Sequence, residues 1–263
     1  MKKITVEKDL GQKETYDKWN GKFLDESAYD KVIKVTDTDM GVMKPIHSLD
    51  GSDVPLAYVI TNAFPQESKI RDILTTIEDT STMRANCSGP IDKEEMLAKG
   101  LVEGQDYKLR TPNSYHTRTK SGGWGMIAYS NEIHSVMIGH KRGRFTGGID
   151  VSGWCKDNKD KWQALQEITE HNETAFAKAN DDIYRSQKSF AENNIRPEHR
   201  IGEGIFTTLS ANRYSAYQSA KMAAHVDSGD TDAGMTSMCV FREGDYDGAY
   251  LCFPRYGIAI DAP

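Results

Sequence analysis

A histidine and an aspartate two residues apart, His225 and Asp227, form the pattern in this sequence that could do chemistry most directly. If the run around them is extended, side chains at positions i and i+2 project from the same face of the strand. An imidazole and a carboxylate side by side can supply two corners of a 2-His-1-carboxylate triad, which holds Fe(II) and leaves positions open for a cosubstrate and oxygen. Such a site needs one more histidine.

The His-x-Asp pattern alone is a weak motif, because the same spacing arises by chance. The chain contains seven histidines, and a second pair, His171 and Glu173, also has the His-x-carboxylate spacing. That pair falls in a stretch of helical periodicity, in which residues i and i+2 point in different directions. We interpret His171 and Glu173 as surface residues, so support for His225 must come from the sequence around it.

Several short β-strands are predicted around the His225 pattern. Runs of β-branched and aromatic residues mark strands over 204–214, 221–225, 235–242, 249–253 and 258–260. Upstream, the pattern predicts a buried strand over 55–63 and helices over 65–79, 90–100 and 159–191. Antiparallel strands that follow helices able to pack outside them are typical of an α+β fold built on a double-stranded β-helix, which is a cupin-like jelly roll.

These elements divide the chain into three regions. Residues 1–55 are polar with short apolar runs and turn signals, which predict an N-terminal arm or short strands. Residues 56–200 supply helical support and basic loops. Residues 201–263 form the first half of the β-helix core and carry the His225 pattern.

Two basic clusters stand out, over 107–123 and 140–148, in a chain whose net charge is −6. They combine basic residues with aromatic residues and glycine, which fits a groove that follows a phosphate backbone and stacks bases. Solvated hairpin loops without a further function have the same composition. The candidate nucleic-acid contacts are Arg110, Arg118, Lys120, Lys141, Arg142 and Arg144.

The composition sets broader limits on class and compartment. With 263 residues, of which 38 % are hydrophobic and 27 % charged, the chain has the profile of an ordinary folded protein. Its net negative charge argues against a protein whose whole surface binds nucleic acid. The four cysteines are widely spaced without a Cys-x-x-Cys pair, which favours reduced thiols over a zinc knuckle. No signal peptide or membrane-spanning run is evident, so we expect a cytoplasmic protein without a membrane partner.

A longer series of residues extends the His225 pattern in both directions. Asn212-x-Tyr214 precedes His225-x-Asp227, and the run from 248 to 260, which reads G-x-x-L-x-F-P-x-Y-G-I-A-I, follows it. The series resembles the 2-oxoglutarate and Fe(II)-dependent dioxygenases. Within that superfamily it looks most like the TET and J-binding-protein branch, whose members hydroxylate the methyl group of thymine or 5-methylcytosine in nucleic acid.

The resemblance implies an oxidoreductase that uses Fe(II), 2-oxoglutarate and O2 for DNA modification. By that resemblance His225 and Asp227 are the first two iron ligands, and Asn212 and Tyr214 hold 2-oxoglutarate. A target base in duplex DNA must be flipped out of the stack before it can react. We therefore expect nucleic acid as the substrate, with the basic clusters beside the mouth of the barrel.

The sequence departs from the family after the 248–260 run. In the dioxygenases that it resembles, the third iron ligand and an arginine that binds 2-oxoglutarate follow some tens of residues after the His-x-Asp. No histidine follows His225 here. Three explanations are open. In the first, the chain is a fragment or half of a split gene, and a second polypeptide supplies the missing C-terminal part of the barrel. In the second, an upstream histidine (His116, His134 or His140) replaces the missing iron ligand. In the third, catalysis has been lost. We favour the first, and expect the chain alone to be poorly active or inactive.

Two other functions remain open alternatives. A non-catalytic binding or assembly protein could keep the β scaffold, with His225 and Asp227 as a polar pair at a loop. A dioxygenase of this kind could also act on a protein side chain or a small molecule, because the fold does not choose the substrate.

Overall fold

The structure, a computed structural model, describes residues 1–20, 22, 24–47, 49–64, 72, 75–76, 82–83, 97–98, 100–111, 114–118, 124–126, 134–142, 147–213, 224–226, 234–241 and 248–262. These residues form a mixed α+β fold, as the sequence predicts. Their strands make up four small sheets, and within the described ranges no sheet closes into a barrel.

The first sheet consists of N-terminal strands. β1 (Lys2–Thr5) pairs in parallel with β3 (Met40–His47), and β3 pairs antiparallel with β4 (Asp53–Val59). β4 corresponds to the strand predicted over 55–63.

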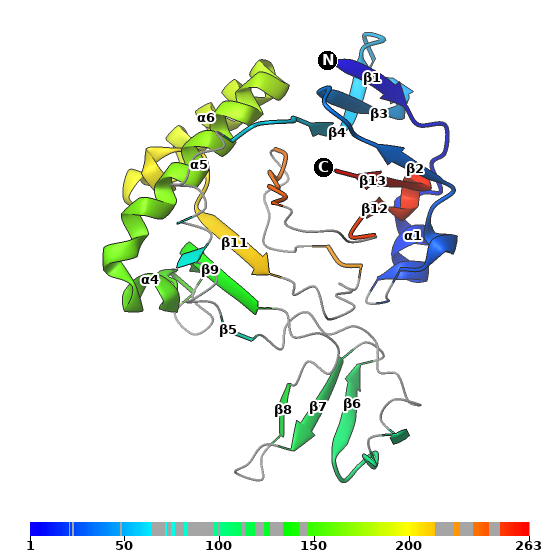
Figure 1. Cartoon of the computed structure of the whole chain (residues 1–263), viewed down its shortest axis with the longest axis vertical. Helices are drawn as coiled ribbons and strands as arrows, with labels where there is room; N and C mark the ends of the chain where they lie inside the picture. Colours follow the sequence, from blue (N-terminus) through cyan, green and yellow to red (C-terminus); the bar gives the residue numbers. More distant parts are fainter. Residues whose placement is uncertain are drawn as a thin grey trace.

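The second sheet joins segments from near the two ends of the sequence (Figure 1). β13 (Ile258–Asp261) lies between β12 (Leu251–Phe253), to which it is antiparallel, and β2 (Lys31–Lys34), to which it is parallel. β12 and β13 are strands that the sequence predicts. Their pairing with β2 is a non-local contact that the local pattern does not reveal.

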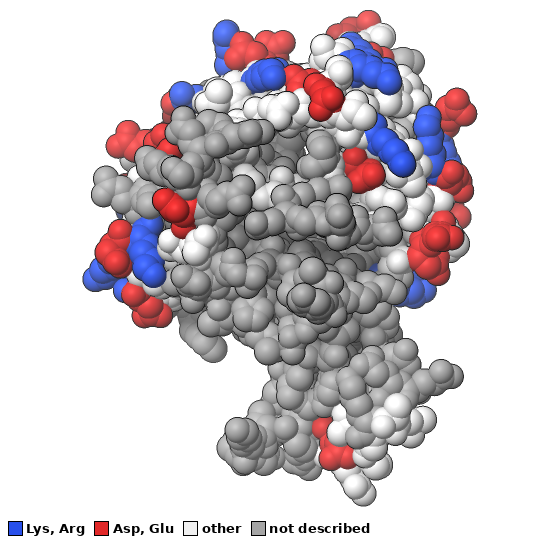
Figure 2. Space-filling model, viewed as in Figure 1, with Lys and Arg blue, Asp and Glu red and all other residues white. Residues whose placement is uncertain are grey.

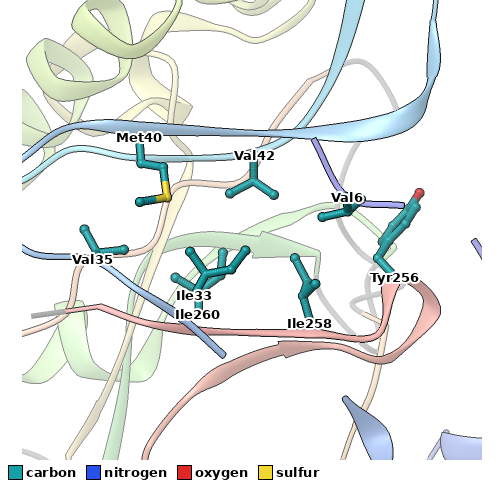
Figure 3. Packing of buried hydrophobic residues seen from close by; sticks show 8 residues of the cluster. All are labelled: Val6, Ile33, Val35, Met40, Val42, Tyr256, Ile258 and Ile260. Carbon is teal, nitrogen blue, oxygen red and sulfur yellow. The ribbon is translucent and has the colours of Figure 1, made fainter. Parts of the chain in front are cut away.

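An apolar core fills the space between these two sheets. In Figure 3, Met40 and Val42 of β3 point toward Ile33 of β2 and Ile258 and Ile260 of β13. Burying one such side chain contributes about 1.5–3 kcal/mol. The core therefore fastens the first two sheets to each other. Its members are Val6, Ile33, Val35, Met40, Val42, Tyr256, Ile258 and Ile260.

The third sheet is centred on β9 (His134–Arg142). β10 (Ile149–Val151) pairs antiparallel with β9. β11 (Thr208–Arg213) and the short β5 (Thr82–Met83) also pair antiparallel with β9. β11 is the strand predicted over 204–214. Val136 and Ile138 of β9 are buried against residues of the helices that follow β10, and they form a second apolar core with Trp154, Cys155 and Ile168.

Three helices lie along the outer side of this sheet in Figure 1. They are α4 (Gly153–Asp157), α5 (Lys159–Ala179) and α6 (Asp181–Asn194). The sequence predicts one helix over 159–191, and the chain instead breaks at Asn180, which adopts an extended conformation with φ −159° and ψ 101°. The Asn180 side chain accepts a hydrogen bond from the Ile183 N–H and so caps α6. Local capping by asparagine is the reason for the break.

The fourth sheet lies at one end of the molecule (Figure 1). β6 (Tyr107–Thr111), β7 (Ser114–Arg118) and β8 (Trp124–Met126) form it with antiparallel pairing. Basic loops were expected in this region, but the described residues of the 107–123 basic cluster form the strands β6 and β7. Cross-strand partners such as Tyr107 and Thr117, residue types that suit a pleated surface, are the local basis for the sheet.

The remaining elements are short. They are α1 (Gln12–Trp19), η1 (Glu26–Ala28), η3 (Pro197–His199), η4 (Ile201–Glu203) and η5 (Pro254–Tyr256). Contrary to the predicted strand over 235–242, residues 235–241 belong to no strand. Most of the helices predicted over 65–79 and 90–100 lies outside the described residues. No helix in the described parts of the chain combines the length and apolarity needed to cross a membrane.

Candidate functional site

β11 carries the first residue of the candidate site. Asn212 pairs with Ser135 of β9 near the end of β11, and its side chain is exposed. Arg213, the last residue of the strand, pairs with His134. Tyr214, the second predicted 2-oxoglutarate residue, lies outside the described residues. The structure thus places Asn212 at an accessible strand end. The position of Tyr214 stays a prediction.

His225 lies in a short described segment, residues 224–226. The Ala224 N–H donates to the Lys22 carbonyl oxygen at 2.9 Å, so the main chain here is held against the segment that follows α1. The His225 side chain is exposed, and so is Val226, at 69 %. Ala224 and His225 do not form the strand predicted over 221–225. Asp227 lies outside the described residues, so the side-by-side placement of the two ligands stays a prediction.

The 248–260 run contains β12, most of β13 and the η5 turn between them. Gly257 ends η5 with φ +62°, and a Cβ built on it would come within 2.9 Å of the Asp30 carboxylate. The Gly257 carbonyl oxygen accepts from the Asp30 N–H at 2.8 Å. Glycine is favoured here because of its left-handed conformation.

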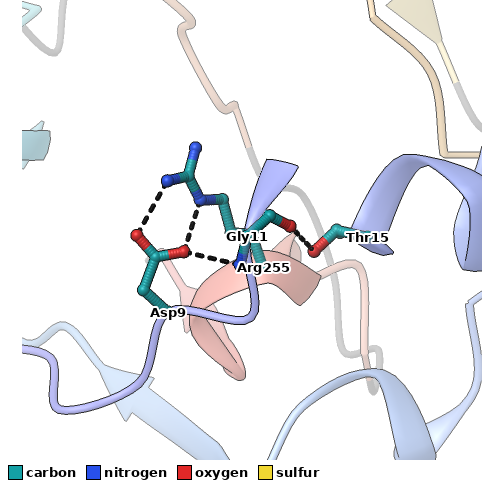
Figure 4. A network of polar contacts seen from close by, with 4 residues as sticks. All are labelled: Asp9, Gly11, Thr15 and Arg255. Carbon is teal, nitrogen blue, oxygen red and sulfur yellow. Dashed lines mark hydrogen bonds and ion pairs between the residues drawn. The ribbon is translucent and has the colours of Figure 1, made fainter. Parts of the chain in front are cut away.

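A salt bridge holds the same turn against the N-terminal segment. Figure 4 shows the Arg255 guanidinium donating through two nitrogens to the Asp9 carboxylate, at 2.6 and 2.7 Å. The Leu10 N–H also donates to the Arg255 carbonyl oxygen. The hydrogen bond from Arg255 holds the pKa of Asp9 below its usual value, and the pKa of Arg255 is raised in turn. This pair positions the turn.

The metal-binding capacity of the described residues is limited. Within the described ranges, no three or more His, Cys, Asp or Glu side chains come together as a group that could hold a metal ion. Of the predicted iron ligands, His225 alone is described, and its accessible imidazole, followed two residues later by a carboxylate, has the donor chemistry of a 2-His-1-carboxylate iron site. The residues present therefore fit part of such a site.

The upstream histidines differ in their placement. His116 lies on β7 opposite Lys108, in the fourth sheet. His134 lies at the end of β9 that pairs with Arg213, close in the ladder to Asn212. His140 lies toward the other end of β9, where its ring contacts that of His199. The register favours His134 as the upstream histidine nearest to the Asn212 strand end.

The interpretation of His171 and Glu173 as surface residues is wrong. Glu173 accepts hydrogen bonds from the Ile205 N–H at 2.8 Å and from the Tyr184 hydroxyl at 3.2 Å. Burial, followed by the charge of Glu173, raises the pKa of Tyr184. The His171 ring packs edge-on against Phe64. Both residues are half-buried, because neighbouring segments cover parts of α5 beyond its apolar face.

Helix side chains also hold residues 234–238, which sequence reasoning missed. The buried Gln187 side chain donates to the Met235 carbonyl oxygen at 3.3 Å and accepts from the Met235 N–H at 3.0 Å. The Ser237 hydroxyl donates to Asn172, which is also buried. The sequence signal for these contacts is the presence of two amide side chains, Asn172 and Gln187, within the apolar pattern of 159–191. A buried amide needs a hydrogen-bond partner.

The predicted nucleic-acid contacts fall on two separate sheets. Arg110 lies on β6, and Arg118 lies on β7 opposite Trp124. Lys141 is exposed on β9 opposite Asp150, and Arg142 lies opposite Ile149. Lys120 and Arg144 lie outside the described residues. In the described part of the face in Figure 2, positive and negative side chains are interspersed.

The chain matches no known family model, and neither the curated proteins nor the solved structures contain one that is significantly similar to it. Its function must therefore be argued from its own residues.

Proposed function

We propose that the chain is an Fe(II)- and 2-oxoglutarate-dependent dioxygenase, or the larger part of one, that hydroxylates the methyl group of a pyrimidine base in nucleic acid. The observation that carries the proposal is the ordered residue series from Asn212 to Ile260. Its first member lies on β11, its imidazole at His225 is accessible, and its last run forms β12, the Gly257 turn and β13. The finer fold that we propose is a double-stranded β-helix with supporting helices.

Each residue of the series has a role in this proposal. His225 and Asp227 hold the metal, and Asn212 and Tyr214 hold 2-oxoglutarate. Bound iron supplies the activation of O2, coupled to decarboxylation of 2-oxoglutarate, that hydroxylates a C–H bond. The protein orients the target methyl group and keeps water away from the site.

We favour a second polypeptide as the source of the third iron ligand. His134 is the alternative source within this chain. Support for the second polypeptide comes from large apolar side chains that are 37–69 % exposed in the described residues between 224 and 251, where they are accessible to a second chain. These side chains are Val226, Met238, Val240, Phe241 and Leu251.

The pyrimidine substrate rests on the likeness to the TET and J-binding-protein branch and on the basic residues. Lys141 is exposed and available to a phosphate. A base in duplex DNA must leave the stack to reach the metal, at a cost of a few kcal/mol. A dioxygenase that acts on a protein side chain or a small molecule remains the alternative within the enzyme class.

A non-catalytic binding or assembly protein is the second candidate function. It is favoured by the large apolar side chains that are exposed in the described residues between 224 and 251. In that case the exposed apolar side chains alone carry the function.

The experiment is an anaerobic titration with Fe(II) and 2-oxoglutarate that follows the visible charge-transfer band of the chelate. It is run on the chain alone and with the polypeptide that the adjoining reading frame encodes. A band from the chain alone places the third ligand within it, and a band only with the added polypeptide places it there. Absence of a band in both cases contradicts the proposal.

Two variants make the titration specific. His225→Ala should abolish the band, since it removes a metal ligand. His199→Gln, a histidine change elsewhere in the fold, should leave the band unchanged. Equal iron affinity in His225→Ala and the unmodified chain would remove the central assignment.

A further inference from the structure

The described elements form two bodies, each with its own apolar packing. The strands of the first two sheets surround the core that contains Val42 and Ile260. The third sheet and α4, α5 and α6 surround the cores that contain Ile138 and Phe176. Between described elements, extensive packing occurs within each group and not from one group to the other. We call these groups the two-sheet body and the helical body, and Figure 1 shows them on opposite sides of the view.

Two polar contacts between described residues join the bodies at the break between α5 and α6. The Asn180 amide nitrogen donates to the Tyr58 hydroxyl at 2.9 Å, and Lys178 forms a salt bridge with Asp39 at 2.8 Å. Tyr58 lies on β4, and Asp39 directly precedes β3. We call these four residues the elbow clamp, and its two contacts link the α5–α6 break to the two-sheet body.

The residues of the clamp are also held within their own bodies. Asp39 accepts hydrogen bonds from the main-chain N–H and the hydroxyl of Thr61, in the segment that follows β4. The next residue, Asn62, has a left-handed conformation with φ +50°. On the other side of the clamp, Asn180 caps α6 by accepting from the Ile183 N–H. The clamp therefore lies where the chain bends in both bodies.

The contacts of the clamp are individually weak. The Lys178 side chain is 58 % exposed, and solvent screens a salt bridge at such a position. The hydrogen bond between Asn180 and Tyr58 joins two neutral groups, so its net contribution is reduced by exchange with water. Relative motion is the expected behaviour of two bodies that share no large apolar interface. Weak contacts of this kind favour one arrangement and leave a second one populated.

We propose that the α5–α6 elbow is a hinge about which the two-sheet body and the helical body move, and that the elbow clamp holds this hinge closed. Hinges are a few residues in loops or at the ends of elements that absorb a change in φ and ψ. Asn180 lies at such a position, extended between two helices, and Asn62 lies in the segment that follows β4. Motion there changes the relation between the bodies while their cores stay packed.

The hinge bears on the proposed function, and this part of the inference rests on that function. Asn212 lies on β11 and belongs to the helical body. The main chain beside His225 is held against the two-sheet body, because Ala224 donates to the carbonyl oxygen of Lys22, shortly after α1, and α1 packs on η5. The proposed cosubstrate residue and the proposed metal ligand thus come from different bodies. Ligands that contact both should favour the closed arrangement.

The test is a distance measurement between the two bodies by pulsed electron resonance. Genetically encoded spin labels replace Lys31 on β2 and Lys159 at the start of α5, both of which are exposed. The unmodified chain should give one dominant distance. Tyr58→Phe removes the acceptor hydroxyl and keeps Asn180, so α6 stays capped. The share of a second distance should rise about threefold to tenfold in this variant.

Lys178→Gln is the second variant, and Arg185→Gln is the matched control. Arg185 forms an exposed salt bridge with Asp181 inside α6, so its loss breaks no contact between the bodies. The second distance should be most populated when Tyr58→Phe and Lys178→Gln are combined, and Arg185→Gln should match the unmodified chain. The melting temperature is measured alongside, because opening of a hinge leaves both cores packed. An unchanged single distance in the combined variant, or an equal change in Arg185→Gln, overturns the hinge.

A ligand arm tests the link to the proposed site. Anaerobic Fe(II) with 2-oxoglutarate should reduce the second distance in Tyr58→Phe. If the clamp variants change the distances and these ligands do not, the hinge is supported and its link to the site is overturned. If the chelate band is absent while the clamp variants still change the distances, the dioxygenase assignment fails and the hinge is supported. Failure of the hinge and failure of the proposed function therefore give different results.

Discussion

Two regions of the molecule are held together by different means. Around β2, β3 and β13, main-chain ladders and one apolar core join segments from near the two ends of the sequence. Around α5 and α6, a separate apolar core of Phe176, Ala191 and Ile205 is supplemented by polar side chains such as Glu173 and Gln187, which hold neighbouring segments by hydrogen bonds. Loss of core packing in the first region should therefore lower the stability of the fold. Loss of one such hydrogen bond in the second region should mainly affect the segment that it holds.

The largest effect should come from the core between the first two sheets. Ile260→Ala removes a side chain that is almost fully buried and should destabilise the fold by about 2–5 kcal/mol. Urea unfolding measures the loss, with Val240→Ala, at an exposed position, as the control. A similar small loss in both variants would show that this core is not the principal source of stability.

A smaller and more local effect is expected at Gln187. Gln187→Leu keeps the volume and leaves both the N–H and the carbonyl oxygen of Met235 without their partner, at a cost of about 1–3 kcal/mol. Hydrogen exchange should speed up at Met235 and remain unchanged in β13. Uniformly faster exchange through both regions would mean that they unfold as one unit and would remove the contrast between them.

The smallest effect, and the one with a pH signature, is expected at the Asp9–Arg255 salt bridge. Asp9→Asn replaces a charge-assisted pair and should cost about 1.5 kcal/mol at neutral pH. The pKa of Asp9 is lowered in the folded state, so its contribution is complete above the ordinary value of 3.8 and is lost as the pH falls through the lower folded value.

Thermal unfolding of the two proteins across that acid range checks the sign. The difference in melting temperature between the unmodified chain and Asp9→Asn should shrink as the pH falls below 3.8. A difference that stays constant with pH would show that packing, and not charge, accounts for the effect of the substitution.

The sequence predicts local elements well where one periodicity dominates. β4, β11, β12 and β13 overlap predicted strands, because their apolar and β-branched residues form runs bounded by turns. The α+β class follows from the same patterns. The helical stripe over 159–191 is also present, apart from the break that capping by Asn180 introduces.

Other features depend on contacts between distant residues and could not be predicted locally. The parallel pairing of β2 with β13 has no signature in either strand. The role of Glu173 depends on Ile205 and Tyr184, which come near it only in the folded chain. Of the candidate iron site, the accessibility of His225 is established, while Asp227 and Tyr214 remain predictions.

The joining of the two ends has a consequence for how the chain folds. Asp9 and Arg255, which clamp the turn before β13, are 246 residues apart in the sequence. During synthesis, β2 and the apolar side of β3 therefore have no partner strand until the residues of β13 have been made. Contacts of such long range slow folding and leave strand edges open to wrong partners in the meantime. Folding yield should accordingly be the property most sensitive to synthesis rate and chaperone supply.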